Sequence, residues 1–201
     1  MGLMHVFEII GTVAFAISGA MVGISKEMDL FGTIFLAITT AVGGGVFRDL
    51  IIGITPPTAF VNPYFCVISI VSALIVFIFY NKLNKLNNII QISDAIGLGA
   101  FTAIGCNVAI NHNFTGTFII VSLGLFTGVG GGILRDVFAQ EIPFVFTKEI
   151  YALIYARKIF DGYTASYICF FTTFIIRVLS IKCGLHLPKV RSEKEKSKFT
   201  L

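Results

Sequence analysis

One octapeptide occurs twice in the chain, and this repetition limits the folds open to the chain more than any other feature. Residues 42–49 read Val-Gly-Gly-Gly-Val-Phe-Arg-Asp, and residues 129–136, which lie 87 positions later, read Val-Gly-Gly-Gly-Ile-Leu-Arg-Asp. Each glycine weakens a helix by about 1 kcal/mol relative to alanine. Because the same costly triplet precedes the same charge pair both times, we interpret the chain as two copies of one structural unit.

The composition places both copies in a membrane. The 201 residues are 56% hydrophobic and only 13% charged, whereas soluble domains carry about 25% charged residues. We therefore predict an all-α polytopic membrane protein with seven transmembrane helices, the sixth being the weakest because charged residues flank its short apolar centre. A spanning helix needs roughly 20 apolar residues, and the candidate runs lie at residues 4–24, 30–47, 63–80, 92–110, 114–134, 144–160 and 163–181.

The similarity between the two halves extends beyond the octapeptide. A stretch rich in small residues recurs 86 positions later, and this offset pairs Glu8 with Asp94, Gly11 with Gly97 and Gly19 with Gly105. Each repeat therefore contains three helices, in residues 4–80 and 92–160, and residues 163–181 form an extra seventh helix. Since three spans separate the copies, the second copy must enter the membrane from the opposite side, which makes the repeats inverted.

The basic residues predict the orientation of these spans. With the N-terminus outside, eleven of the 15 lysines and arginines fall on the inner side and three on the outer side, as the positive-inside rule favours. We therefore expect a multi-pass protein of the inner (plasma) membrane with its C-terminus in the cytoplasm. Residues 1–185 would form a single transmembrane domain, and residues 186–201 a basic tail that suits an anionic membrane face.

The glycine triplets are the first candidates for a functional site. From the helical rise of 1.5 Å per residue, both would lie in the inner two thirds of a hydrocarbon core of about 30 Å. One interpretation is close helix packing, because small residues let backbones approach. The other is a kinked or unwound helix beside a permeation path, where freed carbonyls face water and bind a cation. The residues concerned are Gly43, Gly44, Gly45, Gly130, Gly131 and Gly132.

Charged residues near these triplets leave two interpretations open. The pairs Arg48-Asp49 and Arg135-Asp136 would be interfacial anchors with snorkelling side chains, or the mouth or gate of an ion pathway, because intramembrane charges are usually functional. Glu8 and Asp94 are equivalent in the two repeats and would attract cations at opposite mouths, or would lie at the interfaces. Neutral oxygens at membrane depth would form interhelical hydrogen bonds or line a pore, and they belong to Ser18, Thr39, Thr40, Asn107 and Thr127. Arg177 would pair with another charge or snorkel toward lipid.

The sequence carries no signature of an enzyme, a metal site or a nucleic acid interface. The triplets lack the lysine and the Ser/Thr of a phosphate-binding loop. The three histidines are scattered, and the four cysteines lie far apart without metal-ligand spacing. We therefore expect a protein that is not an enzyme, whose surroundings are the lipid bilayer, and that has no nucleic acid partner.

These motifs resemble those of the prokaryotic trimeric intracellular cation channels. The resemblance rests on the doubled Gly-Gly-Gly-x-x-Arg-Asp, on the Ala-Phe-Ala-Ile-Ser-Gly-Ala run at residues 14–20 and on Pro56-Pro57, and it covers about residues 7–181. It implies seven helices, a homotrimer, and one potassium-permeable pore inside each protomer, with the second and fifth helices kinked at the triplets. Some bacterial relatives are described as glycine transporters instead. The lipid-binding lysines of the animal members have no match that can be placed here, so no lipid site is carried over.

We therefore expect a channel for monovalent cations, with potassium as the permeant ion and no cofactor, while a bound lipid remains open. A small-solute (glycine) secondary transporter is the alternative, because it also requires an inverted repeat with broken helices. A membrane scaffold without transport is a third interpretation. In the channel, Arg48 and Arg135 would set an electrostatic barrier at opposite ends, and leucine at Gly44 or Gly131 would abolish flux without unfolding the protein.

Cysteine accessibility tests the predicted topology. Single cysteines at Ser25, at Asn84 and in the tail should all react with an impermeant thiol reagent from the cytoplasmic side only. Labelling of position 84 and of the tail from opposite sides would contradict seven spans with the N-terminus outside.

Overall fold

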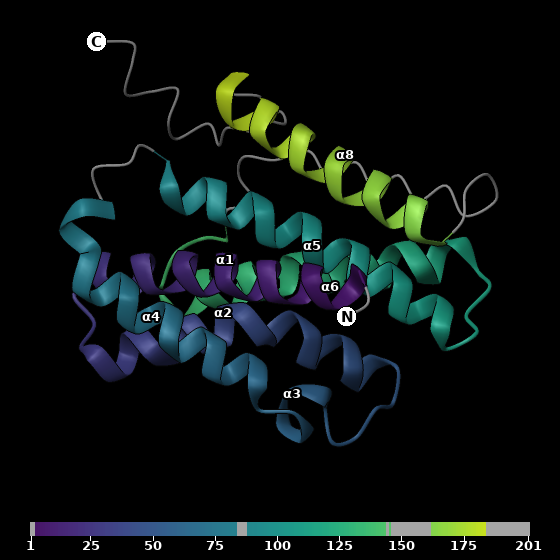
Figure 1. Ribbon diagram of the computed structural model, residues 1–201, viewed down its shortest axis with the longest axis horizontal. Helices are drawn as coiled ribbons and strands as arrows, with labels where there is room; N and C mark the ends of the chain where they lie inside the picture. The colour runs from purple at the N-terminus through teal and green to yellow at the C-terminus, as the bar shows by residue number, and fades with distance from the viewer. Residues whose placement is uncertain (1–2, 84–87, 144, 146–161, 184–201) are drawn as a thin grey trace, which may run out of the picture.

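The computed structural model describes residues 3–83, 88–143, 145 and 162–183 (Figure 1), and these residues contain no β-strand. The helices are α1 (Leu3–Ser25), α2 (Leu30–Ile51), α3 (Thr58–Val61), α4 (Tyr64–Leu83), α5 (Ile89–Asn111), α6 (Thr117–Phe138) and α8 (Gly162–Cys183). Five of them, α1, α2, α4, α5 and α6, are long and apolar enough to cross a membrane, and α8 contains a shorter apolar stretch, Ser166–Leu179. The prediction of an all-α polytopic membrane protein is therefore confirmed. Apart from residue 145, the sixth predicted helix at residues 144–160 lies outside the described residues, as does the tail at residues 186–201.

The two motif helices are longer than predicted. Both α2 and α6 continue four residues beyond the expected ends at 47 and 134, so each Arg-Asp pair lies inside the last helical turns. Within these turns each arginine is neutralised by the carboxylate that follows it. The start of α2 is fixed by Asp29, whose side chain accepts a hydrogen bond from the backbone N–H of Gly32 at 2.7 Å.

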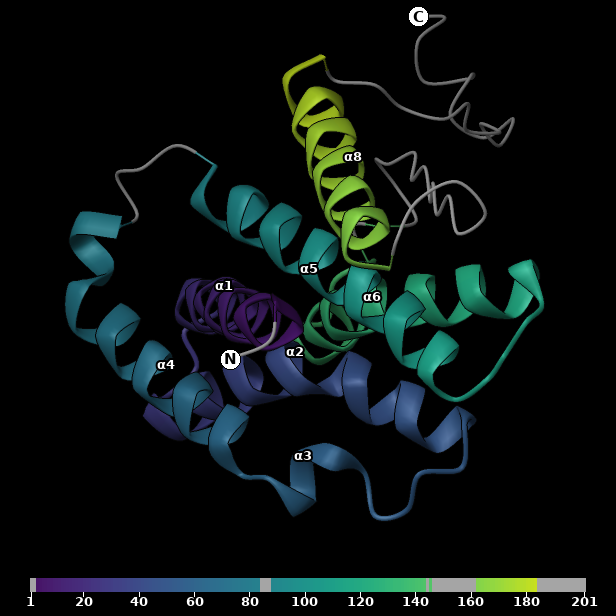
Figure 2. The ribbon, with the colours of Figure 1, turned by 45° about the vertical axis from the view of Figure 1, so that its right-hand side comes forward.

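The inverted repeat is visible in the course of the helices. In Figure 1, α1 and α5 lie side by side and run in opposite directions. Helix α1 packs on α2 as α5 packs on α6, and α2 crosses α6. Equivalent loop positions also share backbone geometry, since Glu27 and Asn113 have φ of 58° and 61°. Helix α4 covers α1 and α2, while α8 covers α5 (Figure 2).

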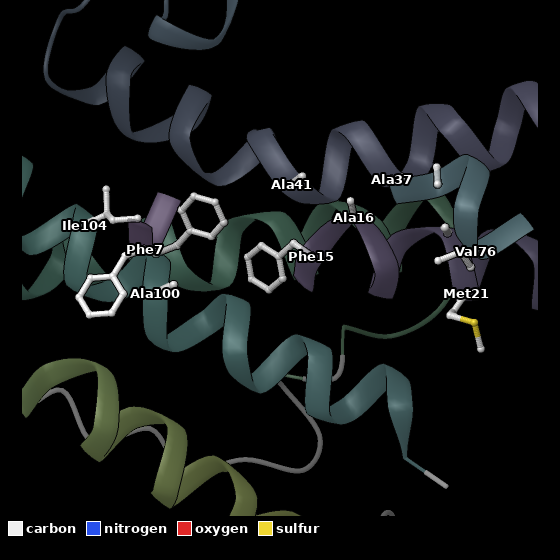
Figure 3. Packing of buried hydrophobic residues seen from close by; sticks show 12 residues of the cluster. Phe7, Phe15, Ala16, Met21, Ala37, Ala41, Val76, Ala100 and Ile104 are labelled. Carbon is white, nitrogen blue, oxygen red and sulfur yellow. The ribbon is translucent and has the colours of Figure 1, made fainter. Parts of the chain in front are cut away.

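The centre of the molecule is an aromatic pair formed by equivalent residues. The rings of Phe15 and Phe101 stack at 5.3 Å between centroids, with an interplanar angle of 16°. Each ring lies against a glycine of the other repeat, so that a Cβ at Gly97 would collide with Phe15, and one at Gly11 would come within 3.0 Å of Phe101. Figure 3 shows Phe15 between α2 and α5 in this core.

The middle glycine of each triplet lets α2 and α6 cross at backbone contact. A Cβ at Gly44 would collide with the carbonyl oxygen of Thr127, and a Cβ at Gly131 would collide with that of Thr40. Both helices continue without interruption through the triplets, so the expectation of unwound backbone with freed carbonyls is wrong for this conformation. A bend at the triplets stays a prediction. Since leucine could not fit at either middle glycine, the expectation that such variants fold is also revised.

Alanine substitution separates the roles of neighbouring glycines. We expect Gly44→Ala to destabilise the protein by about 1–3 kcal/mol, because the backbone of α6 cannot move away without loss of packing. Gly45→Ala is the matched control: the nearest atom to its added Cβ is Arg48 Nη2 at 3.9 Å, and alanine favours the helix by about 1 kcal/mol. Thermal unfolding in detergent measures both variants. Equal midpoints for the two would contradict a tight crossing at Gly44.

Candidate functional site

The first cavity lies between α1, α2, α3 and α5, and we call it the Arg48 vestibule. It has a volume of about 50 Å³, enough for water. Its polar wall is formed by Glu8, Thr12, Arg48, Asp49 and Thr58, and its inner end reaches the ring of Phe101 and Gly45. The sequence-predicted residues Glu8, Arg48 and Asp49 thus line one space.

Within this vestibule Asp49 is held by two groups. Its Oδ1 accepts hydrogen bonds from Nε and Nη2 of Arg48 at 2.9 and 2.7 Å, and its Oδ2 accepts one from the backbone N–H of Thr58 at 2.8 Å. Arg48 is only 8% exposed, so its guanidinium lies in the cavity wall rather than extending to a lipid interface. Both carboxylate oxygens are engaged, which fixes the direction of the charge pair.

The equivalent space in the second repeat is the Arg135 vestibule. It consists of two neighbouring cavities of about 10 and 250 Å³ that share Asp94, Arg135 and Asp136. The smaller cavity reaches Phe15 and Gly132. The larger one opens between the end of α1, the start of α5 and the chain after α6, and its other polar lining comes from Ser25, Gln91, Glu141 and Arg177.

A charge network holds the Arg135 vestibule together. Arg135 donates from Nε to Asp136 at 2.8 Å, and from Nη1 to Asp94 at 2.7 Å and to the hydroxyl of Ser18. Arg177 of α8 donates from Nη2 to the other oxygen of Asp94 at 2.7 Å. The two arginines are 4% and 2% exposed. Buried charges of this kind are tolerated only when they are paired and hydrogen-bonded.

The two vestibules are related by the internal repeat and are separated at the centre. Equivalent residues line both of them, namely Glu8 and Asp94, Gly45 and Gly132, Arg48 and Arg135, and Asp49 and Asp136. Each vestibule is also lined by a phenylalanine of the other repeat. Phe101 of the second repeat lines the Arg48 vestibule, and Phe15 of the first repeat lines the Arg135 vestibule. These two rings stack on each other, so each vestibule is lined by one ring of the same aromatic pair.

The remaining candidates lie away from the vestibules or use their oxygens elsewhere. Thr40 and Thr127 are fully buried at the α2–α6 crossing, and their hydroxyls donate to Leu36 and Leu123 within their own helices, at 2.6 Å each. Thr39 donates to a backbone carbonyl of α2 in the same way. Asn107 accepts from the side chain of Asn111 at 2.9 Å. A Cβ at Gly43 would contact the side chain of Leu134, and one at Gly130 would contact the backbone of Gly44. The first glycines of the triplets therefore also allow close packing.

Two features of the site were not assigned from the sequence. The aromatic pair carried no predicted role, because the sequence gives no signal that separates a buried phenylalanine of a seal from one of the core. Arg177 was left between pairing and snorkelling, and the structure shows the pairing. Among the described residues no group of three or more His, Cys, Asp or Glu side chains could hold a metal ion. The arrangement offers two vestibules with charged walls, each lined by one ring of the stacked Phe15–Phe101 pair.

Comparison with known proteins gives one consistent family. The glycine transporter family matches residues 5–81 and 91–160. The chain is 35% identical to the inner membrane protein YadS of Escherichia coli (strain K12), over 92% of this chain and 95% of that one. It is 36% identical to the membrane protein YvgT of Bacillus subtilis (strain 168), with the same two coverages.

Solved structures agree with these sequence relatives. One TRIC cation channel superposes with a TM-score of 0.85 at 33% identity, over 95% of this chain and 98% of that one. The TRIC trimeric intracellular cation channel orthologue from Rhodobacter sphaeroides superposes with a TM-score of 0.86 at 29% identity, over 92% and 100% of the two chains.

The charge network predicts unequal tolerance to mutation. We expect Arg135→Ala to lower the free energy of unfolding by about 3–5 kcal/mol, because it removes the buried guanidinium that pairs with both Asp94 and Asp136. Glu8→Gln should change it by no more than about 0.5 kcal/mol, since the Glu8 side chain is 34% exposed. Thermal unfolding in detergent gives both values, and a similar loss for the two variants would contradict the network as described.

Proposed function

Because the chain belongs to the glycine transporter family, and solved relatives at 33% and 34% identity are TRIC cation channels, we propose that it is a channel for monovalent cations, with potassium as the main permeant ion. One observation carries the proposal: equivalent charged residues line the Arg48 and Arg135 vestibules, and each vestibule is also lined by one ring of the stacked Phe15–Phe101 pair. The path would run inside one protomer, between α1, α2, α5 and α6.

The vestibules suit a cation that keeps part of its water. The carbonyls of α2 and α6 stay in the helical hydrogen bonds, so they would not replace the hydration shell. Glu8 and Thr12 on one side, and Asp94 and Ser18 on the other, supply oxygens at or beside the cavity walls. The arginines are fixed by their carboxylates and set the height of the electrostatic barrier to the cation. This barrier is high because the site has a low dielectric constant.

We propose that the conformation described here is a closed state of this channel. Two stacked rings form an apolar contact that water and ions do not enter, and apolar constrictions gate channels by dewetting. Opening would require α1 and α5 to separate enough for the rings to part. Since the rings lie against Gly11 and Gly97, a small shift of either helix changes the contact directly.

Assembly and orientation belong to the same proposal. A relative is described as a trimeric channel, and we propose a homotrimer with one path in each protomer. We place the N-terminus outside, so that the Arg135 vestibule, which lies beside Ser25 at the end of α1, faces the cytoplasm. The excess of basic residues on that side supports this orientation.

A secondary transporter for a small solute such as glycine is the second candidate. The family description favours it, and inverted repeats around a central closure also serve alternating access. The cavity of about 250 Å³ contains both arginine and aspartate side chains, which match the carboxylate and the ammonium group of a small zwitterion. A transporter would open one vestibule at a time, whereas a channel opens both together.

Reconstitution in liposomes separates the two candidates. We expect the purified protein to carry potassium down its gradient, with unitary currents in planar bilayers and no saturable uptake of labelled glycine. Saturable glycine uptake without unitary currents would replace the channel with the transporter.

The aromatic pair gives a second test of the path. Phe101→Ala should increase the open probability, because it removes one ring of the seal. Phe7→Ala is the matched control: Phe7 is a buried phenylalanine of α1 that stacks on Phe170 of α8, outside the cavity linings described above. Both changes cost about 3–5 kcal/mol of stability, so only the gating effect should differ. Equal currents for the two variants would contradict a seal at Phe101.

A further inference from the structure

Helix α8 brings a charge into the site that the internal repeat does not supply. Arg177 lies on the helix that follows the two repeats, and it reaches Asp94 across 83 positions of sequence. Its side chain is 2% exposed and lines the larger cavity of the Arg135 vestibule. Asp94 is thereby held by two guanidinium groups, one from Arg135 on Oδ1 and one from Arg177 on Oδ2.

The equivalent position in the Arg48 vestibule has no such second cation among the described residues. Glu8 corresponds to Asp94, and its carboxylate faces Nδ1 of His5 at 3.3 Å. Its side chain is 34% exposed, compared with 12% for Asp94. The repeats therefore place equivalent carboxylates at the two vestibules, but only one of them is enclosed by arginines.

Because of this difference, the two vestibules carry different formal charges. In the described part of the chain, the cluster of Asp94, Arg135, Asp136 and Arg177 sums to zero, whereas Glu8, Arg48 and Asp49 sum to −1. Glu141 at the rim of the Arg135 vestibule adds no net charge, because it is paired with Lys26.

We propose that Arg177 is a positioning residue that fixes Asp94 and neutralises the Arg135 vestibule, so that cation current is larger when ions enter from the Arg48 side. This inference rests on the proposed channel function. A single negative charge about 10 Å from an ion in water raises the local cation concentration roughly twofold. The two current directions should therefore differ by about that factor when the ionic strength is low.

The experiment measures the ratio of the larger to the smaller current at opposite voltages of equal size, so random insertion into the bilayer does not matter. In about 10 mM KCl, where the Debye length is about 30 Å, we expect a ratio of roughly two for the parent protein. In about 1 M KCl, where the Debye length is about 3 Å, the ratio should approach one.

Two single variants should abolish the asymmetry, one by raising the smaller current and the other by lowering the larger current. Arg177→Gln gives the Arg135 vestibule a charge of −1 and should raise the smaller current to the level of the larger one. Glu8→Gln removes the charge of the other vestibule and should lower the larger current to the level of the smaller one. The double variant leaves a charge of −1 at the Arg135 vestibule alone and should restore a ratio of roughly two. Arg177→Lys keeps the formal charge and should rescue the parent ratio, which a purely structural role of Arg177 would not require.

Each outcome decides the proposal. A conducting parent whose ratio is the same in Arg177→Gln overturns the inference and leaves the channel function standing. A parent without unitary currents overturns the proposed function and the inference with it. If Arg177→Gln does not assemble, Glu8→Gln decides alone, because the proposal requires its ratio to approach one in dilute salt, and an unchanged ratio overturns it.

Discussion

The backbone contact between α2 and α6 is the constraint on which the rest of the site depends. Gly44 and Gly131 allow the two helices to cross where any side chain would meet a carbonyl oxygen of the partner. This close crossing brings the last turns of α2 and α6 next to α1 and α5, which carry Glu8 and Asp94. The cost of glycine in a helix, about 1 kcal/mol for each residue, is offset by packing that no larger residue permits.

The second constraint is the cost of burying charge. At membrane depth an unpaired guanidinium or carboxylate is strongly unfavourable, and the described helices contain several of both. The protein meets this constraint by pairing neighbours in sequence, Arg48 with Asp49 and Arg135 with Asp136, and by engaging their remaining atoms with Thr58, Ser18 and Asp94. A rigid charge at a cavity wall is then available to act on a passing ion.

The inverted repeat explains why the site has two ends of similar construction. Each vestibule is lined by its own repeat's motif helix and is closed by a phenylalanine of the other repeat. The helices that cover the repeats are where the symmetry is lost. Helix α8 lies on α5 and contributes Arg177, so the two ends differ in charge although the repeats that form them are alike. In the proposed channel this difference gives the path a direction.

The sequence alone determined the membrane class, the two repeats, their inversion and the importance of the triplets, because these follow from hydropathy, an offset and the number of spans between copies. It also identified most of the charged residues that line the vestibules, whereas Glu141 and Arg177 were not assigned to them. Only the tertiary structure decided which glycine of a triplet packs and which faces a cavity, since Gly44 and Gly45 differ solely in the helix face that meets α6. The same holds for the contacts of Asp94 with Arg135 and Arg177, which join residues 41 and 83 positions apart. Such contacts depend on which faces of distant helices come together, and no local pattern in the sequence contains that information.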